Sequence, residues 1–143
     1  MVENIDDELK ALRMRRLQQL IAGDSLNQET ENWPGSPIPV TDVSLQDFID
    51  QYPLVVLDCW APWCGPCRSL APVFESLAQE YQGKIVFGKL NVDENQRTAA
   101  KYQTMSIPTL LIFKDGKPVD RIVGALPKQA IEEKLKVHLN SGE

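Results

Sequence analysis

Two cysteines three positions apart, Cys64 and Cys67, are the residues of this sequence best suited to chemistry. The thiolate is the reactive form of cysteine, and the N-terminus of a helix stabilises an anion through its unpaired N–H groups and its dipole. Two thiols at this spacing can form a disulfide and release it again on reduction. The pair therefore predicts a reversible redox couple, in which Cys64 attacks a disulfide and Cys67 resolves the mixed disulfide.

The segments around the pair place it where a strand turns into a helix. Residues 54–60 are an almost unbroken apolar run of strand-forming residues, which predicts a strand buried on both faces. Apolar residues then recur at helical spacing over residues 66–82. Gly65 allows a tight turn, and Pro66 suits the first helical position, where its missing N–H costs little. We expect this setting to lower the pKa of Cys64 below the value of about 8.5 of a free thiol.

Half of a metal site is the main alternative for the two cysteines. Zinc takes four ligands in structural sites. The other candidates are Cys59, the single histidine His138 and scattered carboxylates, so a metal would have to be shared between two chains. We therefore predict no metal site, and no cofactor besides a redox-active Cys64–Cys67 disulfide.

Asp58 interrupts the apolar strand just before the pair. Burial of a carboxylate is costly unless the group is paired or neutral, and desolvation raises its pKa toward the range useful for proton transfer. We predict that Asp58 exchanges a proton with Cys67 through water. The alternative is a structural carboxylate paired with the backbone or with Lys89, which could instead tune the pKa of Asp58. Cys59 faces the other side of the strand, where we expect a buried, inert thiol.

The order of the predicted elements indicates an α/β fold. Right-handed crossovers join the first strands, and the Asp115-Gly116 turn predicts an antiparallel hairpin. The result is a mixed central β-sheet with helices on both faces, and Cys64 lies beyond the carboxyl ends of its strands, where such sheets bind ligands. The predicted elements are a strand at 38–40, a helix capped by Ser44, strand 54–60, helix 66–82, strand 84–91, a short helix capped by Asp93 that runs to Tyr102, strands 109–114 and 119–123, and a helix opened by Pro127.

The first 36 residues differ in character from the rest. Residues 1–22 predict an amphipathic helix with acidic residues before basic ones, the order that the helix dipole favours. Residues 23–36 are polar and rich in turn formers, which predicts a linker, and residues 37–143 form the main domain. The helix could dock on the main domain or on a second copy, or it could bind an unknown partner.

Composition narrows the class of protein. The chain has 143 residues, 43% of them hydrophobic, and a net charge of −5, which gives no basic surface for nucleic acid. No apolar run approaches the ~18 residues needed to span a bilayer, and acidic residues stand where a signal peptide would be basic. Three cysteines, two of them closely spaced, suit a reducing compartment. We expect a cytoplasmic protein that binds neither membrane nor nucleic acid.

Around the cysteine pair the chain resembles the thioredoxin family. The likeness runs from about Pro37 to Leu139. It is carried by Trp63-Cys64-Gly65-Pro66-Cys67-Arg68, Asp58, Lys89-Leu90-Asn91-Val92-Asp93, Ile107-Pro108-Thr109 and Val123-Gly124-Ala125. The resemblance implies the thioredoxin fold, a cis peptide bond before Pro108, and the same proton-transfer role for Asp58 that its burial suggests.

The resemblance also implies a function, protein-disulfide reduction, with a thioredoxin reductase as electron donor and disulfide-containing proteins as substrates. The Gly65-Pro66 dipeptide between the cysteines favours a reduction potential that suits a reductase. Two alternatives involve the N-terminal helix: a redox partner dedicated to one target that it recognises through residues 1–22, and a redox-independent binding subunit. The implied substrate-binding surface comprises Trp63, Gly65, Pro66, Ile107, Pro108 and Gly124, with Ala125 beside it.

Overall fold

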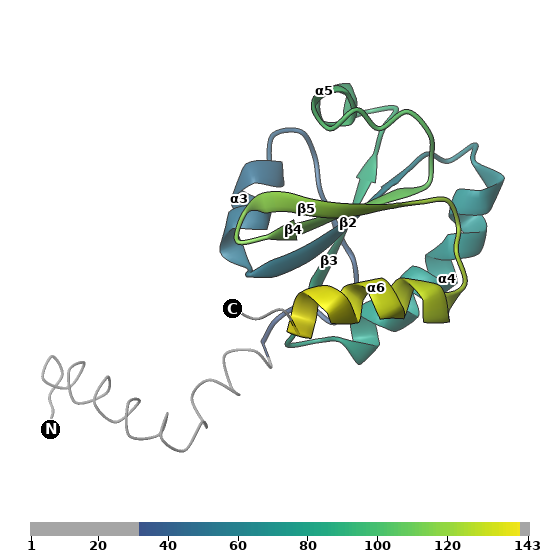
Figure 1. Cartoon of the computed structure of the whole chain (residues 1–143). Helices are drawn as coiled ribbons and strands as arrows, with labels where there is room; N and C mark the ends of the chain where they lie inside the picture. The colour runs from purple at the N-terminus through teal and green to yellow at the C-terminus, as the bar shows by residue number, and fades with distance from the viewer. Residues whose placement is uncertain (1–31, 141–143) are drawn as a thin grey trace, which may run out of the picture. The chain divides into compact units, whose positions relative to one another are not determined.

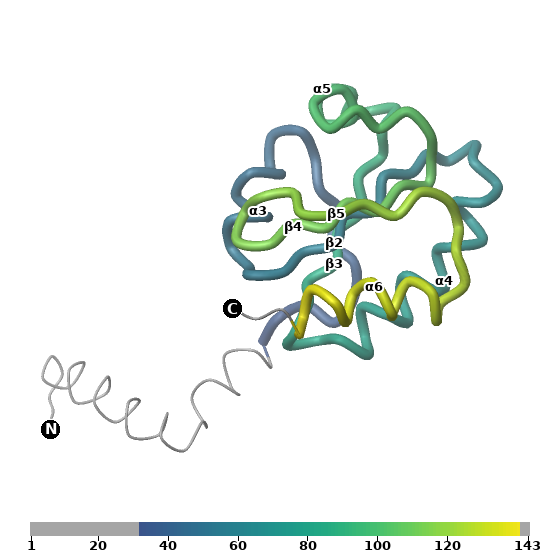
Figure 2. Tube along the Cα trace, in the orientation of Figure 1, coloured from purple at the N-terminus to yellow at the C-terminus, as the bar shows by residue number. Residues whose placement is uncertain are grey.

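The structure is a computed structural model that describes residues 32–140. The helix predicted over 1–22 and most of the linker predicted over 23–36 lie outside the described residues. Within them the strands and helices follow one another in the predicted order (Figures 1 and 2). The elements are β1 (Ile38–Pro39), α3 (Leu45–Gln51), β2 (Leu54–Trp60), α4 (Gly65–Glu80), β3 (Val86–Asn91), α5 (Gln96–Lys101), β4 (Thr109–Lys114), β5 (Lys117–Val123) and α6 (Lys128–Asn140).

The five strands form one mixed sheet in the order β1-β3-β2-β4-β5. β1, β3 and β2 are parallel, whereas β4 is antiparallel to both β2 and β5. The β4–β5 turn has positive φ at Asp115 (53°) and Gly116 (81°), as a type I′ hairpin turn requires. The predicted mixed sheet and hairpin are confirmed. β2 lies at the centre, so its carboxyl end, which leads to Cys64, is flanked by strands on both sides.

Helices cover both faces of the sheet (Figure 1). One face of β2 packs against α4 and α6 in the main core, which includes Val56, Phe74 and Ile131. On the opposite face, the Phe48 ring of α3 lies so close to Gly88 of β3 that a Cβ there would come within 2.8 Å of it. A glycine is therefore needed for α3 to reach the sheet. No helix within residues 32–140 is long and apolar enough to cross a membrane.

The start of α5 corrects the prediction. Asn95, rather than Asp93, is the N-cap residue of this helix. The backbone N–H groups of Arg97 and Thr98 donate to the carboxylate of Asp42, 3.2 and 2.9 Å away. Asp42 is distant in sequence, so local sequence patterns could not identify it as the group that satisfies the first turn.

Smaller corrections concern the starts of β3, β5 and α6 and the capping of α3. β3 begins at Val86 and β5 at Lys117, both two residues from the predicted starts. Ser44 occupies the N-cap position of α3, but its hydroxyl accepts a hydrogen bond from the Thr41 N–H (2.9 Å) instead of from the helix. Pro127 precedes α6 by one residue, and its carbonyl accepts hydrogen bonds from the backbone N–H groups three and four residues further along the chain.

Candidate active site

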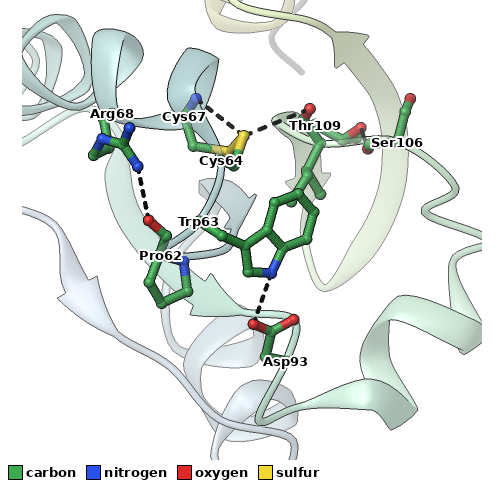
Figure 3. The surroundings of a disulfide bond; sticks show 9 residues. Pro62, Trp63, Cys64, Cys67, Arg68, Asp93, Ser106 and Thr109 are labelled. Carbon is green, nitrogen blue, oxygen red and sulfur yellow. Dashed lines mark hydrogen bonds between the residues drawn. A yellow bond between two sulfur atoms is a disulfide. The ribbon is translucent and has the colours of Figure 1, made fainter.

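The cysteine pair sits at the head of α4. Cys64 is the N-cap residue, and Cys67 lies in the first turn. The two are joined by a disulfide with their Cα atoms 5.2 Å apart, and the Cys67 N–H donates to Cys64 Sγ at 3.2 Å (Figure 3). Their exposed fractions are only 4% and 3%. The predicted position is confirmed: a backbone N–H of the helix terminus points at the sulfur of Cys64.

Chain segments from four strands meet around the disulfide. Cys64 and Cys67 pack with Ala61, and Trp60, Val92 and Ile107 border this small apolar cluster. Cys64 Sγ lies 3.9 Å from the Ile107 carbonyl oxygen. The strand ends that contribute are those of β2, β3, β4 and β5, because the Ile107-Pro108 segment enters β4 and Gly124 follows β5.

The Ile107–Pro108 peptide bond is cis, which confirms what the resemblance implied. The Gly124 N–H donates to the Pro108 carbonyl at 2.8 Å and fixes the segment against the end of β5. Gly124 has a φ of +97°, a value that glycine adopts without strain, and its Cα faces open space. Ile107, Pro108 and Gly124 thus lie together beside the disulfide.

Trp63 is the most exposed aromatic side chain at the site, at 68%. Its indole N–H donates to Asp93 Oδ2 at 2.9 Å (Figure 3). The Arg68 guanidinium donates to the Pro62 carbonyl at 2.9 Å and ties the first turn of α4 to the preceding loop. Sequence reasoning missed both supporting residues. Arg68 immediately follows the motif and could have been suspected, whereas nothing local pairs Asp93 with Trp63.

Asp58 is fully buried in β2, between Lys89 of β3 and Leu110 of β4. Its side chain points to the same face as Val56, which packs with α4 in the main core, because side chains two apart share a face of a strand. Neither carboxylate oxygen has a hydrogen-bond partner among the described residues. Burial raises the pKa of Asp58 to about 7, while the positive charge of Lys89 opposes the rise.

Lys89 does not hold Asp58 in an ion pair. Its ammonium group lies over the Trp60 ring, 4.8 Å from the ring centroid, in a cation–π contact. The lysine therefore acts on the carboxylate through space. This arrangement fits a tuning role for Lys89 better than the structural pair that the sequence left open.

Cys59 is fully buried on the opposite face of β2. Burial, together with the neighbouring Asp58 charge, raises the pKa of its thiol to about 12, so it stays protonated and inert at neutral pH. The imidazole of His138 bonds to Asp120 at 2.9 Å. Within the described part of the chain, no group of three or more His, Cys, Asp or Glu residues is placed to hold a metal ion.

Comparison with known proteins agrees with this geometry. The family model named Thioredoxin matches residues 36–137. A thioredoxin of Staphylococcus aureus is 51% identical over 102 residues, which is 71% of this chain and 97% of that protein. The structure is also similar to that of a mutant thioredoxin from Halobacterium salinarum, with a TM-score of 0.69 and 35% identity over 73% of this chain and 92% of that one.

A second similar structure comes from work on the thiol resolving mechanism of yeast mitochondrial 1-Cys peroxiredoxin via the glutathione and thioredoxin systems. Its TM-score is 0.65 and its identity 31%, over 71% of this chain and 94% of that one. The family match spans the whole sheet and every residue placed at the site above. The chain therefore belongs to the thioredoxin family and is a thiol–disulfide oxidoreductase.

Proposed function

We propose that Cys64 is the nucleophile and Cys67 the resolving thiol in the reduction of protein disulfides. The observation that carries this assignment is the seat of Cys64 at the N-cap of α4, with the Cys67 N–H aimed at its sulfur. A thiolate at this position is stabilised by the helix dipole and by that N–H group. Cys67 does not occupy the N-cap position, because it lies within the first turn of α4.

The reaction consists of two exchanges. The Cys64 thiolate attacks one sulfur of the substrate disulfide, that S–S bond breaks, and one substrate thiolate leaves. Cys67 then loses its proton and attacks Cys64 Sγ, which releases the second substrate thiolate and forms the Cys64–Cys67 disulfide seen in the structure. The substrate gains two electrons, and a reductase must return two electrons to the cysteine pair.

Asp58 is proposed to accept the proton that Cys67 loses. A carboxyl group with a pKa of about 7 is partly ionised at neutral pH and can both accept and return a proton. Its oxygens have no hydrogen-bond partner among the described residues, so transfer through water is the simplest route. Lys89 would keep the pKa of Asp58 from rising further.

The substrate is proposed to lie along the surface beside the disulfide as an extended polypeptide. The Ile107 carbonyl borders Cys64 Sγ, and an extended chain could hydrogen-bond to this backbone as a short added strand. Open space at Gly124 allows the substrate backbone to approach. The proposed contact residues are Trp63, Gly65, Pro66, Ile107, Pro108 and Gly124.

Members of this family act on disulfide-containing proteins and are reduced by a reductase. We propose a thioredoxin reductase as the electron donor, a cytoplasmic location, and the disulfide as the sole redox group. We also propose a catalytic domain over residues 37–143, which the family match supports.

Recognition of a dedicated target through residues 1–22 stays a prediction. Removing residues 1–36 would leave the rate on insulin unchanged for a general reductase. For a dedicated redox partner, removing these residues should abolish reduction of the one target and leave the reduction of insulin unchanged.

The function is tested by dithiothreitol-driven reduction of insulin, followed by the precipitation of its free chains. Wild-type protein should accelerate precipitation. Cys64→Ser should not, and Cys67→Ser should be much slower than wild type, because dithiothreitol must then resolve each mixed disulfide in place of Cys67. Cys59→Ala is the matched control, since its buried thiol takes no part, and it should keep full activity. Full activity of Cys64→Ser would overturn the assignment.

A further inference from the structure

The loop from Tyr102 to Pro108, which leads into β4, is fastened at several points. The Arg121 guanidinium of β5 donates to the carbonyls of Tyr102 and Gln103 at the end of α5. Further along, the Thr109 hydroxyl donates to the Ser106 carbonyl at 2.6 Å. The Gly124 N–H holds the Pro108 carbonyl at the end of the loop. Hydrogen bonds to β4 and β5 therefore hold both halves of this loop.

Met105 lies between these anchors with its side chain 91% exposed. Covering an exposed apolar side chain with a binding partner is favourable. Because the loop is already held on both sides of Met105, less conformational entropy is lost when a partner binds there. Two residues span at most about 7 Å of chain, so Met105 lies that close to Ile107, whose carbonyl borders Cys64 Sγ. Met105 therefore belongs to the same short loop segment that borders Cys64 Sγ.

The loop itself indicates what kind of side chain would meet Met105. Residues 102–108 carry no charged side chain. The nearby Arg121 guanidinium is engaged with two backbone carbonyls. A flexible, polarizable thioether packs against apolar side chains of many shapes. Met105 lies only two residues before Ile107 in the proposed peptide-binding segment, so the substrate polypeptide itself is the occupant that fits.

We propose that Met105 is a specificity-determining residue that contacts an apolar side chain next to the attacked cysteine of the substrate, and that Arg121 is the positioning residue that holds its loop. This inference rests on the proposed function and names a class of substrate for it: polypeptides whose disulfide cysteine has an apolar neighbour.

The test uses two disulfide-bonded peptides that differ only in having Leu or Ser on either side of the cysteine. Wild-type protein should reduce the Leu peptide with a kcat/KM about tenfold higher, equivalent to ~1.4 kcal/mol, mainly through KM. Met105→Glu should abolish this preference, and Met105→Leu should keep it. Val137→Glu is the charge-matched control, because Val137 is also exposed (62%) but lies far from the disulfide. Its neighbour on α6, His138, accepts a hydrogen bond from Lys114 through its carbonyl. Lys114 marks the end of the sheet opposite Cys64.

Arg121 is tested by Arg121→Ala in the same assay. If the arginine acts by holding the loop, Arg121→Ala should weaken the Leu preference as Met105→Ala does. The double variant should then lose no more than the worse single variant. Additive losses would show that Arg121 does not act through Met105.

A small neutral disulfide, dithiodipyridine, separates the outcomes. It is too small to reach from Cys64 to Met105, so every Met105 variant should reduce it at the wild-type rate. A Leu preference that survives Met105→Glu would overturn the inference, while the proposed function would stand if insulin is still reduced. If a Met105 variant lost the same fraction of its rate on dithiodipyridine as on the Leu peptide, the inference would also be overturned, because Met105 would then affect the chemical step. Failure of wild-type protein on all substrates would refute the proposed function itself.

Discussion

Asp58→Asn should make the protein more stable at high pH and slower as a reductase. The carboxylate is fully buried in the centre of the sheet, and its pKa rises from 3.8 to about 7 on folding. Asparagine keeps the shape of the side chain but cannot ionise. The variant therefore removes a buried charge and, with it, the proposed proton acceptor of Cys67.

The magnitude follows from linkage between protonation and folding. Between pH 4 and pH 7 the unfolded state has already lost the Asp58 proton while the folded state retains it, so the free energy of unfolding falls as pH rises. The stability that depends on the neutral Asp58 carboxyl is fully present below the unfolded pKa of 3.8, and it is lost as pH rises through the folded pKa of about 7. A difference of about 3 pKa units corresponds to ~4 kcal/mol in total, of which ~3 kcal/mol is lost between pH 5 and pH 9.

The assay is urea unfolding of the oxidised protein, followed by tryptophan fluorescence at pH 5, 7 and 9. The stability gain of Asp58→Asn over wild type should grow by ~3 kcal/mol from pH 5 to pH 9. Asp47→Asn, an exposed aspartate on α3, is the matched control and should show no such growth. A gain that is the same at pH 5 and pH 9 would refute the idea that Asp58 titrates in the folded state.

Kinetics on the same variant test the catalytic half of the argument. Without its proton acceptor, the attack of Cys67 on the mixed disulfide should slow by up to about a hundredfold, the low end of what general bases contribute. The pH–rate profile should also lose its inflection near pH 7. An unchanged profile would show that Asp58 has no part in proton transfer, whatever its effect on stability.

Three further predictions concern the supports of the site. Asp93→Ala frees the Trp63 indole, so KM for protein substrates should rise about threefold with no change on dithiodipyridine; an unchanged KM would show that the tether does not matter. Phe74→Ala removes a fully buried ring that packs edge-to-face on Phe87, and urea unfolding should show a loss of ~3–5 kcal/mol, whereas a loss under ~1 kcal/mol would contradict this packing. Cys59 should resist iodoacetamide in the native reduced protein at neutral pH, and its alkylation as fast as that of Cys64 would contradict its inert, protonated state.

The sequence alone predicted the catalytic turn because its determinants are neighbours in the chain. A buried strand, Gly65-Pro66 and a helical repeat suffice to place Cys64 at the N-cap of α4, and the structure agrees. The order of strands and helices was predictable for the same reason, because alternating patterns and turn residues are local signals.

The supports of the site escaped prediction because their partners are distant in sequence. The Trp63 indole bonds to a carboxylate 30 positions away, and the α5 N-terminus bonds to Asp42 across 56 positions. Arg121 reaches the loop before β4 from the neighbouring strand. A single sequence carries no local pattern for such contacts, so it indicates Asp93 as a helix cap and does not reveal how the loop at Met105 is held.

The central claim is that substrate sulfur bonds first to the cysteine at the head of α4. The most direct measurement traps the intermediate: reduced Cys67→Ser protein is mixed with oxidised insulin, alkylated, digested and mapped by mass spectrometry. Insulin chains should be found disulfide-linked to Cys64, with Cys59 unmodified. Insulin chains linked to Cys59, or no linkage to Cys64, would contradict the account.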